Sequence, residues 1–278
     1  MATQKRISAS SYSNTAPLIW SFLYGSERGK YEVILDTAPS RSAELLAQKR
    51  VDAALVPVIA YQRIKNVRLI PDVCVGAREK VRSVCLVTKG EDLKDVRSVS
   101  LDVSSKTSVA LTKIIFREFL GFEPKWIDAK PDLDKMLENS DCALLIGDPA
   151  LQILDSKFQI SNAENQKSKL RKFDLVELWR EFTDFGFVFA MWMTRNKTCE
   201  IDFAKVRDEG LSQLDEIIAN YENEISLTHE DFKKYLTENI SFSIDDSMQK
   251  GLELYFELAH KNNLIDDFKK LNFSNFSF

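Results

Sequence analysis

Histidine is scarce in this sequence, and its scarcity excludes the commonest kinds of catalytic centre. Only two occur among the 278 residues, His229 and His260, and both lie in charged, helix-like stretches near the C-terminus. Histidine is the usual general base and the usual partner of a nucleophilic serine. We therefore expect neither a Ser–His triad nor a centre built on a histidine base.

Cysteine is too sparse and too dispersed for a metal site. The four cysteines contain no C-x-x-C pair and lie far from both histidines; they are Cys74, Cys85, Cys142 and Cys199. Structural zinc sites need Cys or His ligands at close, regular spacing. Three of these cysteines stand inside apolar runs. We therefore expect buried free thiols in a reducing compartment and no bound metal.

A basic excess and a long apolar run are also missing. The formal net charge is -4, so no nucleic-acid partner is expected, and the basic run from Lys167 to Lys172 is interpreted as a solvated loop. No apolar stretch is long enough to cross a bilayer, and none follows Met1 as a signal peptide would require. The sequence favours a cytoplasmic protein without a membrane partner. No coiled-coil seam or interface stripe is present to indicate an oligomeric state.

What the chain does contain is an alternation of short apolar runs with helical patterns. Strands are expected at Arg6–Ala9, Glu32–Asp36, Ala53–Val58, Cys74–Ala77, Val81–Lys89, Val99–Leu101, Pro124–Ile127, Ala143–Ile146 and Phe187–Trp192. Helices are expected at Ala16–Tyr24, Ser40–Gln48, Ser108–Leu120, Leu133–Asn139, Asp174–Thr183, Phe203–Asn220, Thr228–Asn239 and Asp245–Lys261, and from Gly147 to Leu154. Such alternation predicts an α/β fold with largely parallel sheet, followed by a helical C-terminal segment.

Two long apolar strands, Val81–Lys89 and Phe187–Trp192, flank the middle of the chain. A two-lobed protein whose chain crosses between lobes twice has this arrangement. We expect one lobe to comprise residues 1–87 and 190–278 and the other to comprise residues 88–189. The cleft between the lobes is then the expected ligand site.

The composition of three strand-to-helix corners carries the chemical signal. They are SASSYSNTAPL after the first strand, LDVSSKTSVAL after Val99–Leu101, and LLIGDPAL after Ala143–Ile146. Each corner places small hydroxyl, amide or acidic residues at a helix N-terminus, where unpaired N–H groups and the helix dipole attract anions. In an open parallel sheet, such corners lie at the carboxyl ends of the strands, where ligands bind.

Each corner also has a purely structural interpretation. Asn14 or Thr15 can cap the first helix, and Asp148 before Pro149 has the pattern of an N-cap. Tyr12 can be a packing residue with a solvated hydroxyl, and Ser83 can be an ordinary strand residue. The second corner differs, because Ser104, Ser105, Thr107 and Ser108 provide more polar groups than one cap needs. That surplus favours ligand binding.

Six segments, taken in order, resemble the chorismate dehydratases of the futalosine route to menaquinone. They are S-Y-x-N-T-x-P-L at Ser11–Leu18, D-A-A-L-V-P-V-I-x-Y at Asp52–Tyr61, V-R-S-V-x-L at Val81–Leu86, L-D-x-S-S-x-T-S-V-A-L at Leu101–Leu111, A-L-L-I-G-D-P-A-L at Ala143–Leu151 and F-V-F-A-M-W at Phe187–Trp192. The chain departs from that pattern at Ala16, where a larger residue is frequent, and at Gly186, where proline is common.

The resemblance implies a type II periplasmic-binding-protein-like fold and a hydro-lyase that converts chorismate to 3-[(1-carboxyvinyl)oxy]benzoate. It implies no cofactor, because loss of water makes the ring aromatic. In this interpretation Asn14 holds the enolpyruvyl carboxylate or the departing hydroxyl, and that carboxylate takes the ring proton. Ser83, Thr107 and Ser108 are the expected carboxylate contacts. The remaining expected substrate-binding residues are Ser11, Tyr12, Ser105, Gly147 and Asp148.

Two other functions remain open at this point. One is an enzyme similar to the later enzyme of that route, which makes 1,4-dihydroxy-6-naphthoate and uses a catalytic histidine in the cleft. The other is a non-catalytic binding protein for a small dicarboxylate on the same scaffold. The positions of His229 and His260 outside all six segments argue against the first.

Overall fold

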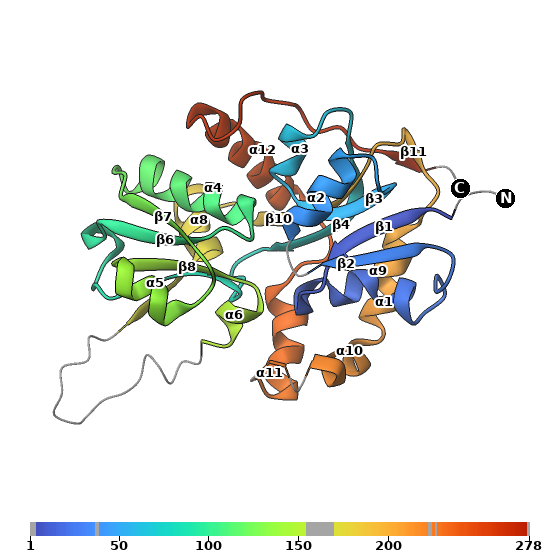
Figure 1. Ribbon diagram of the computed structural model, residues 1–278, viewed down its shortest axis with the longest axis horizontal. Coiled ribbons are helices and arrows are strands. Elements are labelled where there is room, and N and C mark those ends of the chain that lie inside the picture. Colours follow the sequence, from blue (N-terminus) through green and yellow to red (C-terminus); the bar gives the residue numbers. More distant parts are fainter. Residues whose placement is uncertain (1–3, 37–38, 154–169, 222–223, 226, 277–278) are drawn as a thin grey trace.

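The computed structural model describes residues 4–36, 39–153, 170–221, 224–225 and 227–276. They form two α/β lobes that lie side by side, with both ends of the chain on the same lobe (Figure 1). Each lobe is built on a five-stranded sheet covered by helices. The two-lobed α/β architecture expected from the sequence is confirmed.

The first sheet has the strand order β2-β1-β3-β10-β4. Its strands are β1 (Arg6–Ser10), β2 (Glu32–Asp36), β3 (Ala53–Pro57), β4 (Arg68–Ala77) and β10 (Phe187–Thr194). The strands β1, β2 and β3 are parallel, and β10 runs antiparallel to both of its neighbours. The helices of this lobe are η1 (Ser13–Thr15), α1 (Ala16–Leu23), α2 (Pro39–Ala47), α3 (Ala60–Arg63), α9 (Phe203–Leu211), α10 (Leu214–Tyr221), α11 (His229–Lys234) and the π-helical η4 (Tyr235–Asn239).

The second sheet repeats this plan with the order β7-β6-β8-β5-β9. Its strands are β5 (Val84–Thr88), β6 (Ser98–Asp102), β7 (Lys125–Ala129), β8 (Cys142–Ile146) and β9 (Arg171–Asp174), and β5 is the antiparallel one. Its helices are η2 (Leu93–Asp95), α4 (Lys106–Ile114), the π-helical η3 (Ile115–Phe119), α5 (Leu133–Asn139), α6 (Asp148–Leu151) and α8 (Leu175–Thr183). In each sheet, the reversed strand is the one that follows a crossing from the other lobe.

Sequence patterning explains most of these elements. Strands β3, β5 and β8 are buried along their whole length, which matches their continuous apolar sequence. Strand β2 alternates exposed and half-buried residues because it lies at the edge of the first sheet. The expected helix Phe203–Asn220 proves to be two helices, α9 and α10, and the expected strand Val81–Lys89 begins only at Val84.

The chain changes sheet between Ala77 and Val84 and again between Asp174 and Phe187. The lobe limits expected from the sequence, 87/88 and 189/190, stay predictions. The first strand after each crossing, β5 or β10, begins a few residues before the expected limit. Aromatic rings pack at the second crossing, where Phe187 lies 5.5 Å from Trp179 of α8 and 5.1 Å from Tyr255 between ring centroids. The core is therefore continuous from one lobe to the other.

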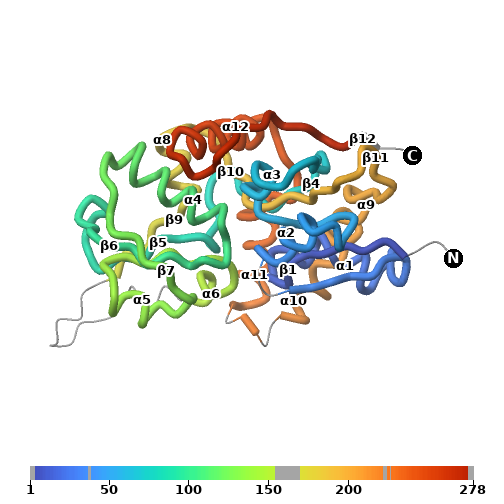
Figure 2. The backbone as a smooth tube through the Cα atoms, turned by 45° about the horizontal axis from the view of Figure 1, so that its top comes forward, coloured from blue at the N-terminus to red at the C-terminus, as the bar shows by residue number. Residues whose placement is uncertain are grey.

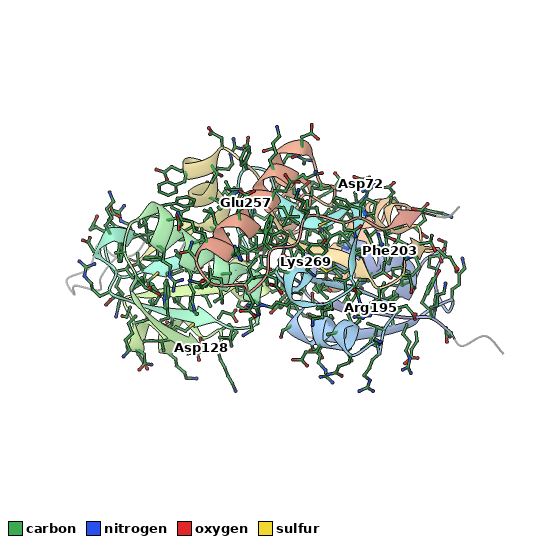
Figure 3. The ribbon with its side chains drawn as sticks, turned by 90° about the horizontal axis from the view of Figure 1, so that it is seen from above. Asp72, Asp128, Arg195, Phe203, Glu257 and Lys269 are labelled. Carbon is green, nitrogen blue, oxygen red and sulfur yellow. The ribbon has the colours of Figure 1, made fainter. Side chains whose placement is uncertain are left out.

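The helix α12 (Asp246–Lys261) lies over the seam between the lobes, as Figure 3 shows through its labelled Glu257. Tyr255 of this helix donates a hydrogen bond to the carbonyl of Thr107 at 3.1 Å, and Lys261 pairs with Glu118 at 2.6 Å. The chain after α12 returns along the first lobe (Figure 2), where Lys269 donates to the carbonyl of Ile64 at 2.8 Å. Farther along, β12 (Asn275–Phe276) pairs in parallel with β11 (Thr198–Cys199).

Candidate functional site

A cavity lies between the carboxyl ends of the two sheets. It is lined by residues from both lobes: Ser10, Tyr12, Asn14, Thr15, Pro39, Leu55, Pro57, Val75, Val81, Ser83, Val84, Ser105, Ser108, Ile146, Gly147, Phe189 and Ala190. The lining follows the ends of β1, β2, β3, β6 and β8, as expected for ligand sites of parallel sheets. None of these lining residues is charged, so the cavity offers hydroxyl, amide and backbone groups to a ligand.

The first corner exposes Asn14 to this cavity. Neither η1 nor α1 has a side-chain cap, so the alternative in which Asn14 or Thr15 caps the first helix is not what the structure contains. Thr15 instead donates its hydroxyl to the carbonyls of Ser10 at 2.6 Å and Tyr12 at 2.8 Å. These bonds hold the turn in shape, and the Asn14 side chain lies at the cavity near the Tyr235 hydroxyl.

In the second corner, hydroxyl groups both cap the helix α4 and line the cavity. Ser105 is the N-cap of α4 and accepts a hydrogen bond from the backbone N–H of Ser108 at 3.4 Å. The hydroxyls of Ser105 and Ser108 lie 3.2 Å apart, and both residues line the cavity at the N-terminus of α4. Because this end of a helix carries partial positive charge, it suits a carboxylate.

Thr107 faces away from the cavity. It is 0% exposed, and its hydroxyl accepts a hydrogen bond from the backbone N–H of Ile59 in the first lobe at 3.3 Å. Thr107 is not among the lining residues. The geometry thus gives the residue expected as a carboxylate contact a different role, which is to join α4 to the other lobe.

The third corner joins the lobes as well. Gly147, with φ of 67°, is the N-cap of α6, so the N-cap interpretation of Asp148 does not hold. Asp148 instead accepts two hydrogen bonds from Ser13 in the first lobe. The backbone N–H of Gly147 donates to the carbonyl of Ser83 at 2.7 Å, which places Ser83 in the cavity wall.

Burial raises the pKa of several groups around the cavity. Desolvation is the main cause for Tyr12, Asp102 and Asp148. Tyr235 is buried behind the lining, and burial raises the pKa of its hydroxyl while the nearby side chains of Ser83 and Asn14 lower it. That hydroxyl makes no aligned hydrogen bond within the described part of the chain. The side chains that line the cavity itself carry no charge, whereas Asp102 and Asp148 lie behind them.

Six residues expected from the sequence meet at this cavity: Tyr12, Asn14, Ser83, Ser105, Ser108 and Gly147. Three others, Ser11, Thr107 and Asp148, do not line it. Ser11 lies behind the first corner, where its carbonyl accepts a hydrogen bond from Tyr221 at 3.2 Å. The other lining residues were not among those expected: Ser10, Thr15, Pro39, Leu55, Pro57, Val75, Val81, Val84, Ile146, Phe189 and Ala190. Ser10, Pro57 and Ile146 stand at or next to the carboxyl ends of predicted strands, and that position is the signal that could have found them.

Both histidines lie outside the cavity lining. His229 is in α11 and lies 3.3 Å from Asp215, and His260 is at the end of α12, with its ring 6.4 Å from that of Phe268. No cluster of three or more potential metal ligands occurs among the residues that the structure describes. Within the same residues, no helix is long and apolar enough to cross a membrane.

Comparison with known proteins places this geometry in a family. Residues 5–261 match the model of the menaquinone biosynthesis family. The chain is 28% identical over 257 residues to a chorismate dehydratase of Thermus thermophilus, with 88% of this chain and 92% of the relative covered.

Solved structures agree on the fold. A protein of Archaeoglobus fulgidus superposes with a TM-score of 0.66 at 17% identity, covering 95% of this chain and 100% of that one. The periplasmic aliphatic sulphonate binding protein of Escherichia coli superposes with a TM-score of 0.61 at 14% identity, covering 95% and 88% of the two chains. The two-lobed fold is thus periplasmic-binding-protein-like, and by the match over nearly its whole length the chain belongs to the menaquinone biosynthesis family.

Proposed function

We propose that this protein is a chorismate dehydratase, a hydro-lyase that removes water from chorismate to give 3-[(1-carboxyvinyl)oxy]benzoate. The observation that carries the proposal is the alignment with the Thermus thermophilus chorismate dehydratase over most of both chains. The cavity supports it, because chorismate carries two carboxylates and a hydroxyl, and the lining supplies neutral hydrogen-bond donors from both lobes.

The reaction breaks one C–H bond and one C–O bond of the cyclohexadiene ring. A base takes the proton from the ring carbon that bears the enolpyruvyl ether. The neighbouring hydroxyl leaves as its C–O bond breaks, and it takes up this proton from the base to form water. Among the described residues, those that line the cavity include no histidine and no carboxylate. We assign the base to the substrate's own enolpyruvyl carboxylate, which lies next to that ring carbon. Formation of the aromatic ring drives the elimination.

Asn14 is the group that we assign to this step. Its amide N–H can hold the enolpyruvyl carboxylate over the ring proton or donate to the departing hydroxyl, and it stands free of capping bonds at the cavity. An oriented donor in a poorly hydrated site stabilises developing charge without reorganisation. Tyr12 and Gly147 close the same part of the cavity and exclude water from it.

The ring carboxylate has a natural place at the N-terminus of α4. Ser105 and Ser108 present hydroxyls there, and Ser83 adds a third from the start of β5. Hydrogen bonds from neutral groups and from a helix N-terminus bind a carboxylate without a basic residue. We therefore assign substrate binding to Ser83, Ser105 and Ser108.

One experiment tests the proposal directly. Purified protein is incubated with chorismate, and the mixture is resolved by chromatography with detection of the aromatic product. Catalytic formation of 3-[(1-carboxyvinyl)oxy]benzoate by the wild type is expected. Asn14→Ala should lower kcat by roughly 10²–10³-fold, the usual loss for an oriented donor to developing charge. The control is Asn139→Ala, an exposed asparagine of α5.

Two outcomes contradict parts of this proposal. Stoichiometric binding of chorismate without product excludes the dehydratase and identifies a binding protein for a dicarboxylate. Full activity of the Asn14→Ala variant excludes the role of Asn14 and leaves the reaction itself established.

A further inference from the structure

Ser13 and Asp148 form a two-point contact across the cleft. The Ser13 hydroxyl donates to Oδ1 of Asp148 at 2.5 Å, and the Ser13 backbone N–H points to Oδ2 at 3.3 Å. Ser13 belongs to η1 of the first lobe, and Asp148 is the first residue of α6 in the second. Because one residue engages both carboxylate oxygens, the contact fixes the orientation of η1 as well as its distance from α6.

The residues beside this pair are those that line the cavity. Tyr12 and Asn14 stand on either side of Ser13, and Gly147 precedes Asp148. A Cβ on Gly147 would lie 3.3 Å from the Tyr12 ring, so the ring rests directly against the glycine backbone. When Ser13 engages Asp148, the Asn14 amide is therefore carried to a defined place in the cavity wall.

The pair is partly shielded from water, since Ser13 is buried and Asp148 is half-buried. Ser13 is 0% exposed, and burial raises the pKa of Asp148, although its hydrogen bonds with Ser13 lower it. When the lobes separate, Asp148 loses Ser13 and is hydrated instead. The strength of the contact thus depends on closure of the cleft, and its residues make no contact with the cavity themselves.

We propose that Asp148 is a positioning residue, which holds Ser13 across the closed cleft and thereby places Asn14 against the substrate. The inference rests on the proposed function, because Asn14 is the group to be placed. Asp148 touches neither the substrate nor the reacting atoms. It acts through Ser13, so the two residues work as one unit.

Kinetics of single and double variants test this coupling. Ser13→Ala and Asp148→Ala should each lower kcat about tenfold and change KM for chorismate less than threefold. The double variant should be no slower than the slower single variant. Asp148→Asn keeps one acceptor oxygen for the Ser13 hydroxyl, so it should recover part of the lost kcat. The control is Gln152→Ala, which removes another bond between the lobes, from Gln152 to the carbonyl of Glu224 at 2.8 Å, away from Asn14. This control should keep the wild-type kcat.

A measurement without turnover separates this inference from the proposed function. Spin labels are placed at the exposed positions Asp128 of the second lobe and Lys205 of the first, after substitution by cysteine. The distance distribution is recorded with and without chorismate. In Ser13→Ala and Asp148→Ala, the population with separated lobes should grow relative to the wild type, whether or not product forms.

The outcomes decide clearly between the two claims. If the variants open but the wild type forms no product, the Ser13–Asp148 contact is confirmed as a link between the lobes. The same result rejects the dehydratase function. The positioning role is overturned if product forms and the losses in kcat of the two single variants add in the double variant. It is also overturned if Asp148→Ala raises KM and leaves kcat unchanged. Unchanged distance distributions in both variants overturn it as well.

Discussion

The carboxylate of Asp174 accepts a hydrogen bond from the backbone N–H of Arg82 at 2.6 Å, and this bond joins the two segments by which the chain passes between the lobes. Asp174 also accepts from Val81 at 3.1 Å on the first segment. On the second segment it caps α8 through the N–H groups of Val176 at 2.9 Å and Glu177 at 3.3 Å. A single buried side chain therefore fixes the two crossings relative to each other.

Replacement of Asp174 should destabilise the protein strongly. Asp174→Ala leaves four backbone N–H groups of the crossings without their carboxylate, and we expect a loss of roughly 2–4 kcal/mol in the free energy of unfolding. Urea denaturation measures this loss. The control is Asp132→Ala, which removes the exposed cap of α5 and should cost about 1 kcal/mol. Equal losses in the two variants would contradict the special role of Asp174.

Gly147 should be required for two separable reasons, backbone conformation and contact with Tyr12. Gly147→Ala introduces a side chain at φ of 67° and within 3.3 Å of the Tyr12 ring, so both stability and kcat/KM should fall. Gly121→Ala is the matched control, because it has φ of 79° with nothing within 4 Å. Gly121→Ala should lose about 1 kcal/mol of stability. Gly147→Ala should lose more, because its φ of 67° and ψ of -145° lie in a region that glycine alone adopts readily and because its side chain meets Tyr12. Only Gly147→Ala should lose activity. Equal activity in both variants would show that the contact between Gly147 and Tyr12 is not needed for activity.

Thr107 and Ser108 are neighbours in sequence with different expected effects. Ser108→Ala removes a cavity hydroxyl and should raise KM for chorismate by roughly tenfold, as loss of a hydrogen bond to a charged group does. Thr107→Val removes the acceptor of the Ile59 N–H and should lower stability by about 1 kcal/mol. Its KM should stay within twofold of the wild type, judged from steady-state rates. A large rise in KM for Thr107→Val would restore it as a substrate contact.

The four cysteines should be unreactive in the folded protein. All are free and buried, and burial raises the pKa of each thiol, to about 12 for Cys85. Because the thiolate is the reactive form, almost none is present at pH 8. Titration with a thiol reagent should therefore detect no fast-reacting group in native protein and four after denaturation in urea. Rapid reaction of a native thiol would contradict this packing.

Local sequence signals predicted the corners well, because strand ends and helix starts are set by nearby residues. The polar corners that follow β1 and β6 were sufficient to identify cavity residues such as Asn14 and Ser108. The same signals misled at Asp148. Its position before Pro149 is typical of an N-cap, but its carboxylate bonds to a residue 135 positions away, and no local pattern encodes such a partner.

Elements at the sheet edges were also difficult to predict. Strand β9 has the sequence RKFD, which is basic and polar because one side of this edge strand has no strand partner. The interpretation of Lys167–Lys172 as a solvated loop is therefore wrong for Arg171 and Lys172, which lie in β9. The basic run Lys167–Lys172 ends within β9, and its residues 167–169 lie outside the described part of the chain. The sequence predicts a strand from Val81, but Arg82 adopts φ of 61°, which interrupts the regular backbone that a strand needs.

The place of β10 has a consequence for the order in which the protein folds during synthesis. This strand lies between β3 and β4, and its pairs with them join residues more than a hundred positions apart. The first sheet therefore stays split until residue 194 has left the ribosome. All strands of the second sheet, from Val84 to Asp174, have been made by then. Since domains generally fold as units during synthesis, the lobe encoded in the middle of the gene can finish first and bring the two halves of the other together.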